Sequence, residues 1–367
     1  MNIKLKILFS ILMITALIFG FIHIYFPADN YSFERLHIFL FNLCTGGTIL
    51  LYYTRGRAEV SKTITFFFFG SLIYAFSAFF KIYPITILVS VPLFILVEKI
   101  RIEKFSFIPI QFISRKEPVS EKFHQASLLC LSIGIVMASL VILNNEYFKF
   151  VTMEKLTLNT FFLGFSFPLS LITLSLVFSM LKKIEGSSAK IVMEVCFWTI
   201  TLGVIIFFIF ILFETFIPQI FVTAALFTAV VLVFLLYTTF ADKIQQKLFL
   251  TSGIGFLILT AISGIVYICM QMSEGYDPQK IKWLLHMHVF ASLYGWNLCG
   301  LSIICRFDDF PIRLHSITVI CIHWLTVIVL APLGVFYGGF AILAIIGYSF
   351  ITLTLFFSSN KREIIHE

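Results

Sequence analysis

The stretch WLLHMHVFASLYGWNLCG, from Trp283 to Gly300, is apolar over nearly the length of a membrane helix and holds two histidines near its start. Similar apolar runs recur along all 367 residues, of which 60% are hydrophobic and only 12% charged. A soluble globular domain carries about 25% charged residues, so the composition excludes that class. The sequence therefore predicts an integral membrane protein.

The apolar runs are separated by charged turns or by turns that contain Pro or Gly, and they predict an all-α polytopic fold of twelve helices. One membrane domain over 1–367 is expected, with a loop at about 99–122 after the short fourth helix. The predicted helices are 5–27, 34–53, 62–80, 84–98, 123–143, 157–181, 189–213, 218–240, 247–272, 283–305, 313–331 and 333–357.

The basic residues are distributed unequally between the two sides of this scheme. Twenty of the 26 Lys and Arg lie at the two ends of the chain or in the connections that follow even-numbered helices. Basic loops stay in the cytoplasm, so both termini are predicted to be cytoplasmic in a bacterial-type inner membrane. The net charge of +7 is then a signal of topology, and no nucleic-acid surface is needed to explain it.

Three histidines are predicted at one depth, near the outer ends of their helices: His37 on the second helix, and His286 and His288 on the tenth. The two segments share the spacing L-H-x3-F-x4-G, and Asn159 on the sixth helix is a weaker echo at the same level. These helices are four apart, which predicts three arcs of four helices in a pseudo-threefold arrangement. Residues i and i+2 of a helix point about 200° apart, so the paired histidines should face different neighbours.

A His-x-His pair on a tenth helix, with a histidine at the outer end of the second, resembles subunit I of haem-copper oxidases and the related nitric oxide reductases. Imidazole is a common axial ligand of haem iron. The resemblance implies a b-type haem with His37 and His288 as low-spin ligands, and a high-spin haem on His286. It also implies electron transfer, sensing of NO or O2, or quinol chemistry, with a redox partner or quinol. The NnrS-like twelve-helix proteins share the His-x-His feature.

The chain departs from this family at the copper site. The family binds copper through histidines on helices six and seven, whereas here helix six has none and helix seven offers only Glu194 and Cys196. The expectation is therefore a haem-binding relative without copper. Arg35 and Lys282 lie close in sequence to the histidines and are expected either to meet haem propionates or to serve as interfacial anchors.

The role of His323 and two other functions for the whole chain remain open at the level of sequence. His323 lies mid-span on the eleventh helix and is a secondary candidate ligand, with hydrogen-bonded packing as the alternative. The whole chain also fits a twelve-helix secondary transporter or channel-like protein, because Gly46–Gly47, 164–168 and Gly338–Gly339 would loosen helices around a midplane site. A scaffold whose histidines bind nothing is the third reading.

The topology is testable by cysteine labelling in intact cells. A cysteine introduced at Gly275 is expected to react with a membrane-impermeant maleimide from outside, because this connection precedes the tenth helix. A cysteine at Arg115 is the control and should react only after lysis. Reaction of the Gly275→Cys variant only after lysis would contradict the orientation.

Overall fold

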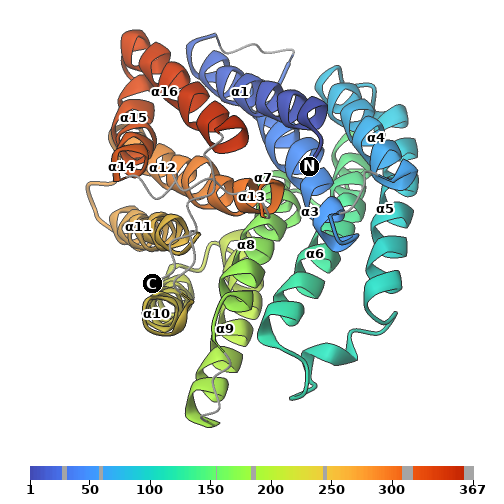
Figure 1. The fold of residues 1–367 in the computed structure, drawn as a ribbon. Helices are drawn as coiled ribbons and strands as arrows, with labels where there is room; N and C mark the ends of the chain where they lie inside the picture. Colours follow the sequence, from blue (N-terminus) through green and yellow to red (C-terminus); the bar gives the residue numbers. More distant parts are fainter. Residues whose placement is uncertain are drawn as a thin grey trace. The chain divides into compact units, whose positions relative to one another are not determined.

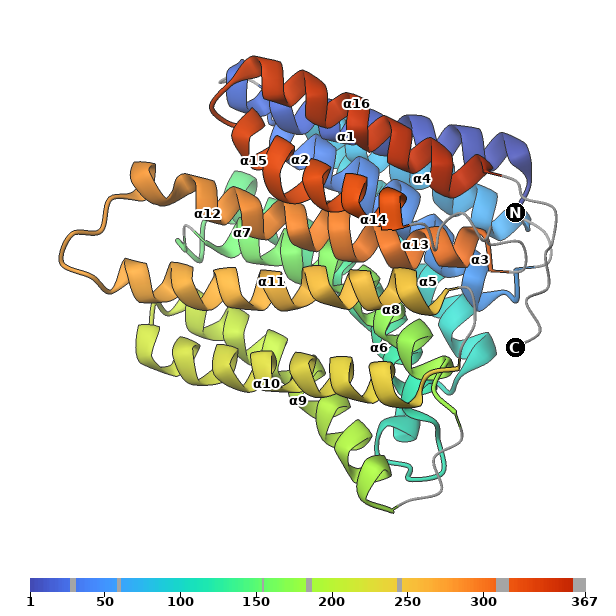
Figure 2. The ribbon, with the colours of Figure 1, turned by 60° about the vertical axis from the view of Figure 1, so that its left-hand side comes forward.

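The computed structural model describes residues 1–26, 31–57, 61–153, 155–182, 187–242, 246–307 and 317–358. These ranges contain helices and one isolated antiparallel bridge, between Leu181 and Ala241, but no strand (Figures 1 and 2). Among the described residues, eleven helical segments are long and apolar enough to cross a membrane. The predicted all-α polytopic fold is confirmed, and the chain is an integral membrane protein.

Short π-helical segments interrupt several of the helices. The α-helices are α1 Ile3–Tyr25, α2 Phe33–Ile38, α3 Thr48–Thr54, α4 Lys62–Phe79, α5 Tyr83–Lys104, α6 Val119–Leu143, α7 Leu156–Phe161, α8 Phe167–Ser179, α9 Ser187–Leu212, α10 Phe216–Phe240, α11 Lys247–Gln271, α12 Pro278–Phe290, α13 Leu298–Cys305, α14 Ile317–Trp324, α15 Ala331–Gly334 and α16 Gly338–Phe357. The π segments are η1 Phe39–Gly47, η3 Asn144–Phe148, η4 Phe162–Ser166, η5 Ala291–Asn297 and η7 Leu325–Leu330, and η2 Ile110–Phe112 is a 3-10 turn. Joined through the π segments, the described helices form the twelve predicted rods.

The second, sixth and tenth rods share one construction, an α-helix followed by a π segment and a second α-helix. Each π segment contains glycine: Gly46 in η1, Gly164 in η4 and Gly295 in η5. A side chain at Gly46 would overlap Leu169, and one at Gly295 would overlap the Phe256 ring. The spacing L-H-x3-F-x4-G therefore marks glycines that lie in π segments. The pseudo-threefold arrangement itself stays a prediction.

The chain divides into two compact units. Unit 1 comprises Met1, Ile11–Ser175 and Val204–Thr215, and unit 2 comprises Asn2–Ser10, Leu176–Gly203 and Phe216–Glu367. In unit 1, α5 packs against α4 and α6, and η4 packs against α6. In unit 2, α10, α11 and α12 run side by side, while α16 packs against η7 and α15 (Figure 2). His37 thus belongs to unit 1, and the other three candidate histidines belong to unit 2.

Helix α5 is longer than its prediction. It was expected at 84–98 but continues to Lys104, while α6 begins at Val119, so the connection between them is 105–118. The predicted end at residue 98 rests on the run of charged residues after residue 97, which is typical of a helix end. The structure pairs Arg101 with Glu98 one turn earlier, at 2.6 Å, and this (i, i+3) pair lets the helix continue.

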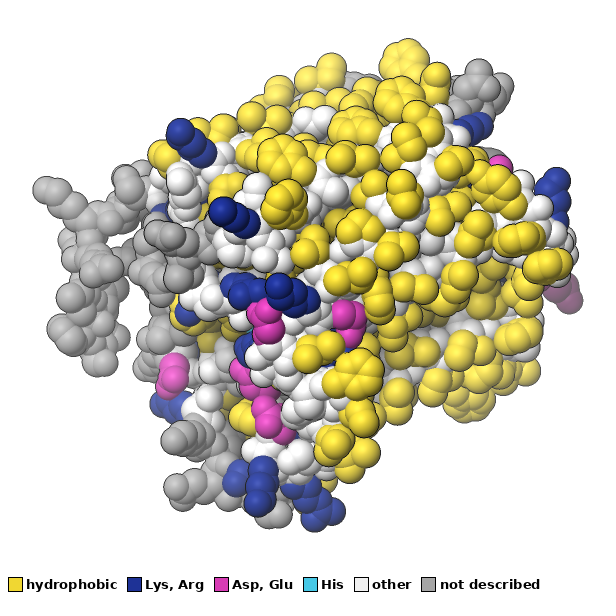
Figure 3. All heavy atoms as spheres, turned by 90° about the vertical axis from the view of Figure 1, so that its right-hand side faces the viewer, with side chains coloured by type: hydrophobic (Ala, Val, Ile, Leu, Met, Phe, Trp, Pro, Cys, Tyr) yellow, Lys and Arg dark blue, Asp and Glu magenta, His cyan; other side chains and the backbone are white. Residues whose placement is uncertain are grey.

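The outer surface of unit 1 is apolar along α4 and α5. Phe66 on α4 is 69% exposed and Leu88 on α5 is 72% exposed. The face drawn in Figure 3 is hydrophobic over most of its area, with basic and acidic side chains gathered towards one end. Monomeric soluble proteins rarely expose such a continuous apolar area. Lipid tails are the partner that this surface fits.

We expect the contact between α6 and η4 to depend on two glycines. A Cβ at Gly134 would overlap the backbone of Gly164, which has no side chain that could move aside. Gly134→Ala should therefore lower the free energy of unfolding by about 1–3 kcal/mol. The measurement is the thermal unfolding of the purified protein in detergent.

The matched control is Gly339→Ala, because no described atom outside its own helix backbone lies within 4 Å of a Cβ at that position. Equal melting temperatures for the two variants would show that the rods do not approach as closely as described.

Candidate functional site

His288 lies on α12 with its ring against α11. Its Nδ1 is 3.2 Å from the Ser263 hydroxyl oxygen. A side chain at Gly264 would meet the imidazole, with its Cβ 3.3 Å from the His288 Cε1. The glycine thus leaves the space that the ring occupies, and the serine holds one ring nitrogen.

His286 faces a different set of neighbours from His288. Its ring lies 6.3 Å from the Phe290 ring one turn along the helix, and Phe290 lies 5.9 Å from Tyr294. Tyr294 in turn meets Tyr348 of α16 edge to face, at 5.0 Å. His286 therefore stands at the start of an aromatic series that leads to α16. That the paired histidines serve two different pockets stays a prediction.

His37 lies on α2 with its ring against α1. A Cβ at Gly20 would be 3.8 Å from the His37 Cγ, so the ring again fills the space beside a glycine. Its buried Nδ1 has no hydrogen-bond partner among the described residues. In the shared sequence spacing, His37 corresponds to His286. In the structure, however, His37 contacts a glycine of the preceding rod, as His288 does.

His323 on α14 is fully buried within unit 2. Its Nε2 is 2.8 Å from the carbonyl oxygen of Tyr294, which lies in η5. The Phe256 ring is 4.8 Å away and the Phe249 ring is 6.2 Å away. This is the geometry of hydrogen-bonded packing, the alternative that the sequence left open.

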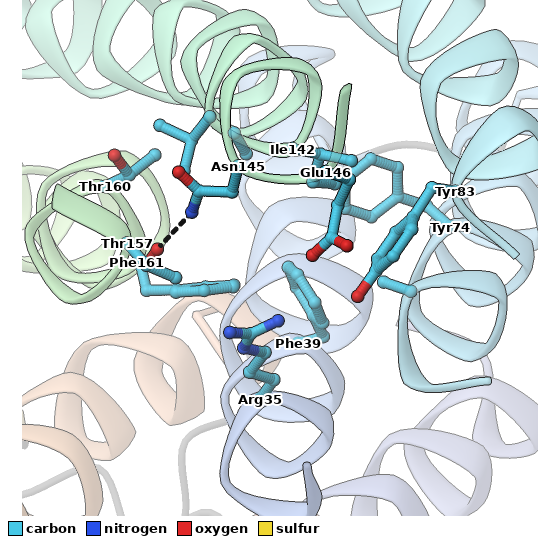
Figure 4. Close-up of a pocket in the computed structure, with 13 residues that line it drawn as sticks. Arg35, Phe39, Tyr74, Tyr83, Ile142, Asn145, Glu146, Thr157, Thr160 and Phe161 are labelled. Atoms are coloured by element: carbon cyan, nitrogen blue, oxygen red, sulfur yellow. Dashed lines mark hydrogen bonds between the residues drawn. The ribbon is translucent and has the colours of Figure 1, made fainter. Parts of the chain in front are cut away.

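Arg35 lines a pocket of unit 1 and points towards Glu146 and Tyr83 (Figure 4). The pocket holds about 40 Å³ of water-sized space. Lys282 on α12 is exposed. The propionate role of both residues stays a prediction. The lining residues are Arg35, Phe39, Tyr74, Ala78, Tyr83, Ala138, Val141, Ile142, Asn145, Glu146, Thr157, Thr160 and Phe161.

The polar side of this pocket is built from four rods, the second, fourth, fifth and sixth. Tyr83, Glu146 and Arg35 all line the pocket, and the Arg35 guanidinium lies 5.9 Å from the centre of the Phe161 ring. Beside them the Asn145 amide donates to the Thr157 hydroxyl at 3.0 Å (Figure 4). The lining holds one arginine and one glutamate, so the pocket suits water or a small polar molecule more than a lone anion.

Sequence reasoning missed Tyr83 and Glu146. The available signal was weak, because each is a single polar residue at the end of a predicted span, on the side of the membrane with few charges. Tyr83 and Glu146 line the same pocket because of the way in which α5 and η3 pack around α2. Within the described ranges, no group of three or more His, Cys, Asp and Glu residues is placed to hold a metal ion.

Comparison of this chain with protein-family models, with curated proteins and with solved structures finds no match.

The packing role of His323 is testable by substitution. His323→Leu removes the donor to the Tyr294 carbonyl, and an unsatisfied buried carbonyl costs about 1–3 kcal/mol. We expect the thermal unfolding temperature in detergent to fall accordingly, with no change in any visible absorption of the protein.

The control is His23→Leu, which breaks an exposed pair with Glu34 at 3.6 Å. Exposed ion pairs contribute about 0–1 kcal/mol, so this variant should remain close to the wild type. Loss of a visible absorption band in His323→Leu would instead make His323 a ligand.

Proposed function

We propose that the chain is a haem-binding membrane protein that resembles subunit I of haem-copper oxidases but lacks the copper site. Its role would be electron transfer, the sensing of NO or O2, or quinol chemistry. The observation that carries the proposal is the way in which α11 holds the ring of His288.

The Ser263 hydroxyl determines which nitrogen of His288 carries the proton. A serine hydroxyl has one hydrogen, and that of Ser263 is donated to the Thr260 carbonyl at 2.9 Å. The Ser263 oxygen therefore accepts from the Nδ1–H of His288 at 3.2 Å. In the neutral ring, Nε2 is then left with its lone pair. Iron-ligating histidines are commonly held in this way, with the second ring nitrogen donating to an oxygen.

The other residues fit the same role. Haem iron, when bound, supplies one-electron transfer or a binding position for a diatomic gas. His288 would present Nε2, Ser263 would orient the ring, and Gly264 leaves the ring its space. His286 faces other neighbours, so it would serve a second pocket. The assignment of His37 as the other low-spin ligand comes from the family resemblance and stays a prediction.

Copper has no part in the proposal. The Cys196 thiol, one of the two side chains in the seventh rod that could replace a histidine, donates to the Ala229 carbonyl at 3.8 Å. The sixth rod carries Asn159 near the family's ligand level, and its amide donates to the Phe208 carbonyl at 3.1 Å. Both groups are engaged in packing between helices.

The deciding experiment is the absorption spectrum of the protein purified from haem-replete cells. We expect a Soret band, with the six-coordinate signal lost in His288→Ala and retained in His286→Ala. Ser263→Ala should keep the haem but weaken its retention about 10–100-fold, the usual effect of removing the group that orients a ligand.

Ser252→Ala is the matched control, because Ser252 is a serine of the same helix that accepts instead from the Trp324 indole at 2.8 Å. It should leave the spectrum unchanged. Equal loss of one signal in both histidine variants would contradict the two-pocket assignment, and the absence of a Soret band from the wild type would refute haem binding.

A transporter is the second candidate, favoured by the pocket of Arg35, Tyr83 and Glu146 and by the π segments that interrupt the second, sixth, tenth and eleventh rods. Interrupted helices line substrate sites in many secondary transporters. This candidate predicts a colourless protein in which Glu146→Gln changes the uptake of a small polar solute. The matched variant Glu214→Gln, which removes the carboxylate bonded to Lys155 at 3.0 Å, should leave uptake unchanged.

A further inference from the structure

The 105–118 loop between α5 and α6 exposes an unusual set of apolar side chains. We name this set the apolar tip; its members are Phe107, Ile108, Ile110 and Ile113, which are 72%, 61%, 64% and 80% exposed. Covering one such side chain contributes about 1.5–3 kcal/mol. Four of them within seven residues indicate a surface that is covered in the membrane.

A buried arginine holds the base of this loop. Arg101 is 3% exposed, and its Nε and Nη2 donate to the Glu98 carboxylate at 2.6–3.0 Å. Its two terminal nitrogens also donate to the carbonyls of Ser106 and Phe107, each at 3.1 Å. The planar guanidinium therefore ties the start of the loop to the last turns of α5.

A second anchor joins α3, α5 and α6 next to this arginine. The Thr54 hydroxyl donates to the Leu50 carbonyl at 2.8 Å, so its oxygen accepts from the Nε2–H of His124, also at 2.8 Å. His124 Nδ1 then accepts from the Lys104 ammonium at 3.0 Å, and Lys104 also pairs with Glu121 at 3.1 Å. These bonds hold the base of the apolar tip rigid. Contacts within the fold therefore compensate the conformational entropy that is lost when the loop is ordered.

The length of α5 would place the loop at the boundary of a bilayer that this helix crosses. Helix α5 has 22 residues and is about 33 Å long, close to the thickness of the hydrocarbon core. Three exposed basic side chains lie on either side of the apolar tip in sequence: Lys99 on α5, and Arg115 and Lys116 in the loop itself. Of the nearby acids, Glu103 is already paired with Arg55 at 2.6 Å. A rigid apolar tip with an excess of cations around it is complementary to an anionic leaflet.

We propose that the 105–118 loop is a docking element for anionic phospholipids. The apolar tip enters the boundary between headgroups and acyl chains, while Arg115 and Lys116 contact the phosphates. A lipid leaflet is the occupant because the exposed apolar side chains lie in a loop at the end of a helix of bilayer length, and because the charge beside them is basic. This inference is independent of haem binding.

The experiment uses the full-length protein with Ile110→Trp, reconstituted in phosphatidylcholine nanodiscs. A small fraction of either brominated phosphatidylglycerol or brominated phosphatidylcholine is added, and the four native tryptophans are subtracted with the wild type. We expect quenching at residue 110, at least about threefold stronger with the anionic lipid, because each basic residue near the surface adds attraction. Lys280→Trp, at a side chain 83% exposed, is the control and should not be quenched.

A second variant tests the charges separately. Adding Arg115→Gln and Lys116→Gln to Ile110→Trp should keep the quenching but abolish the preference for phosphatidylglycerol. Equal quenching by the two lipids before these changes would overturn the proposal. Quenching of Trp at residue 110 by aqueous iodide, and by neither lipid, would also overturn the proposal. That result is expected of a surface that binds a soluble protein.

Discussion

Every carbonyl inside a bilayer needs a donor, since there is no water to supply one. A π segment releases backbone carbonyls from the regular ladder of an α-helix, and such segments frequently mark functional sites. Here the hydroxyl of Thr45 donates to the Leu40 carbonyl in η1, and the His323 imidazole bonds the Tyr294 carbonyl in η5. In η1 and η5, side chains thus complete the hydrogen bonding of the interrupted rods. This requirement accounts for a histidine in the middle of a membrane span.

The glycines serve the same architecture in a second way. Helices in membranes approach each other through small residues, because lipid provides little hydrophobic drive for their association. Gly134 and Gly164 bring two backbones together, whereas Gly20 and Gly264 each leave room for an imidazole from the next rod. The rings of His37 and His288 are thus positioned by the absence of a side chain on a neighbouring helix. An aromatic ring held against a glycine has little freedom to turn, as a ligand of a metal requires.

The charged residues divide into buried pairs and surface groups. Burying an unpaired charge is costly, and Arg101 is buried together with Glu98 and two loop carbonyls. Arg35 lines a pocket together with Tyr83 and Glu146 at the other end of α5. An arginine therefore stands at each end of this helix, one lining a pocket and one supporting a loop. The exposed cations beside the loop have no such internal role.

The sequence alone determined the all-α membrane fold, the twelve rods and the divergence of His286 from His288. These features follow from the length of apolar runs and from the 100° between successive residues of a helix, which are local properties. Only the tertiary structure decided that α5 continues to Lys104, that Ser263 holds His288, and that Tyr83 and Glu146 share a pocket with Arg35. Each of these depends on partners from other helices. A single span does not encode them, because the energy of a buried polar group is set by the group that it meets.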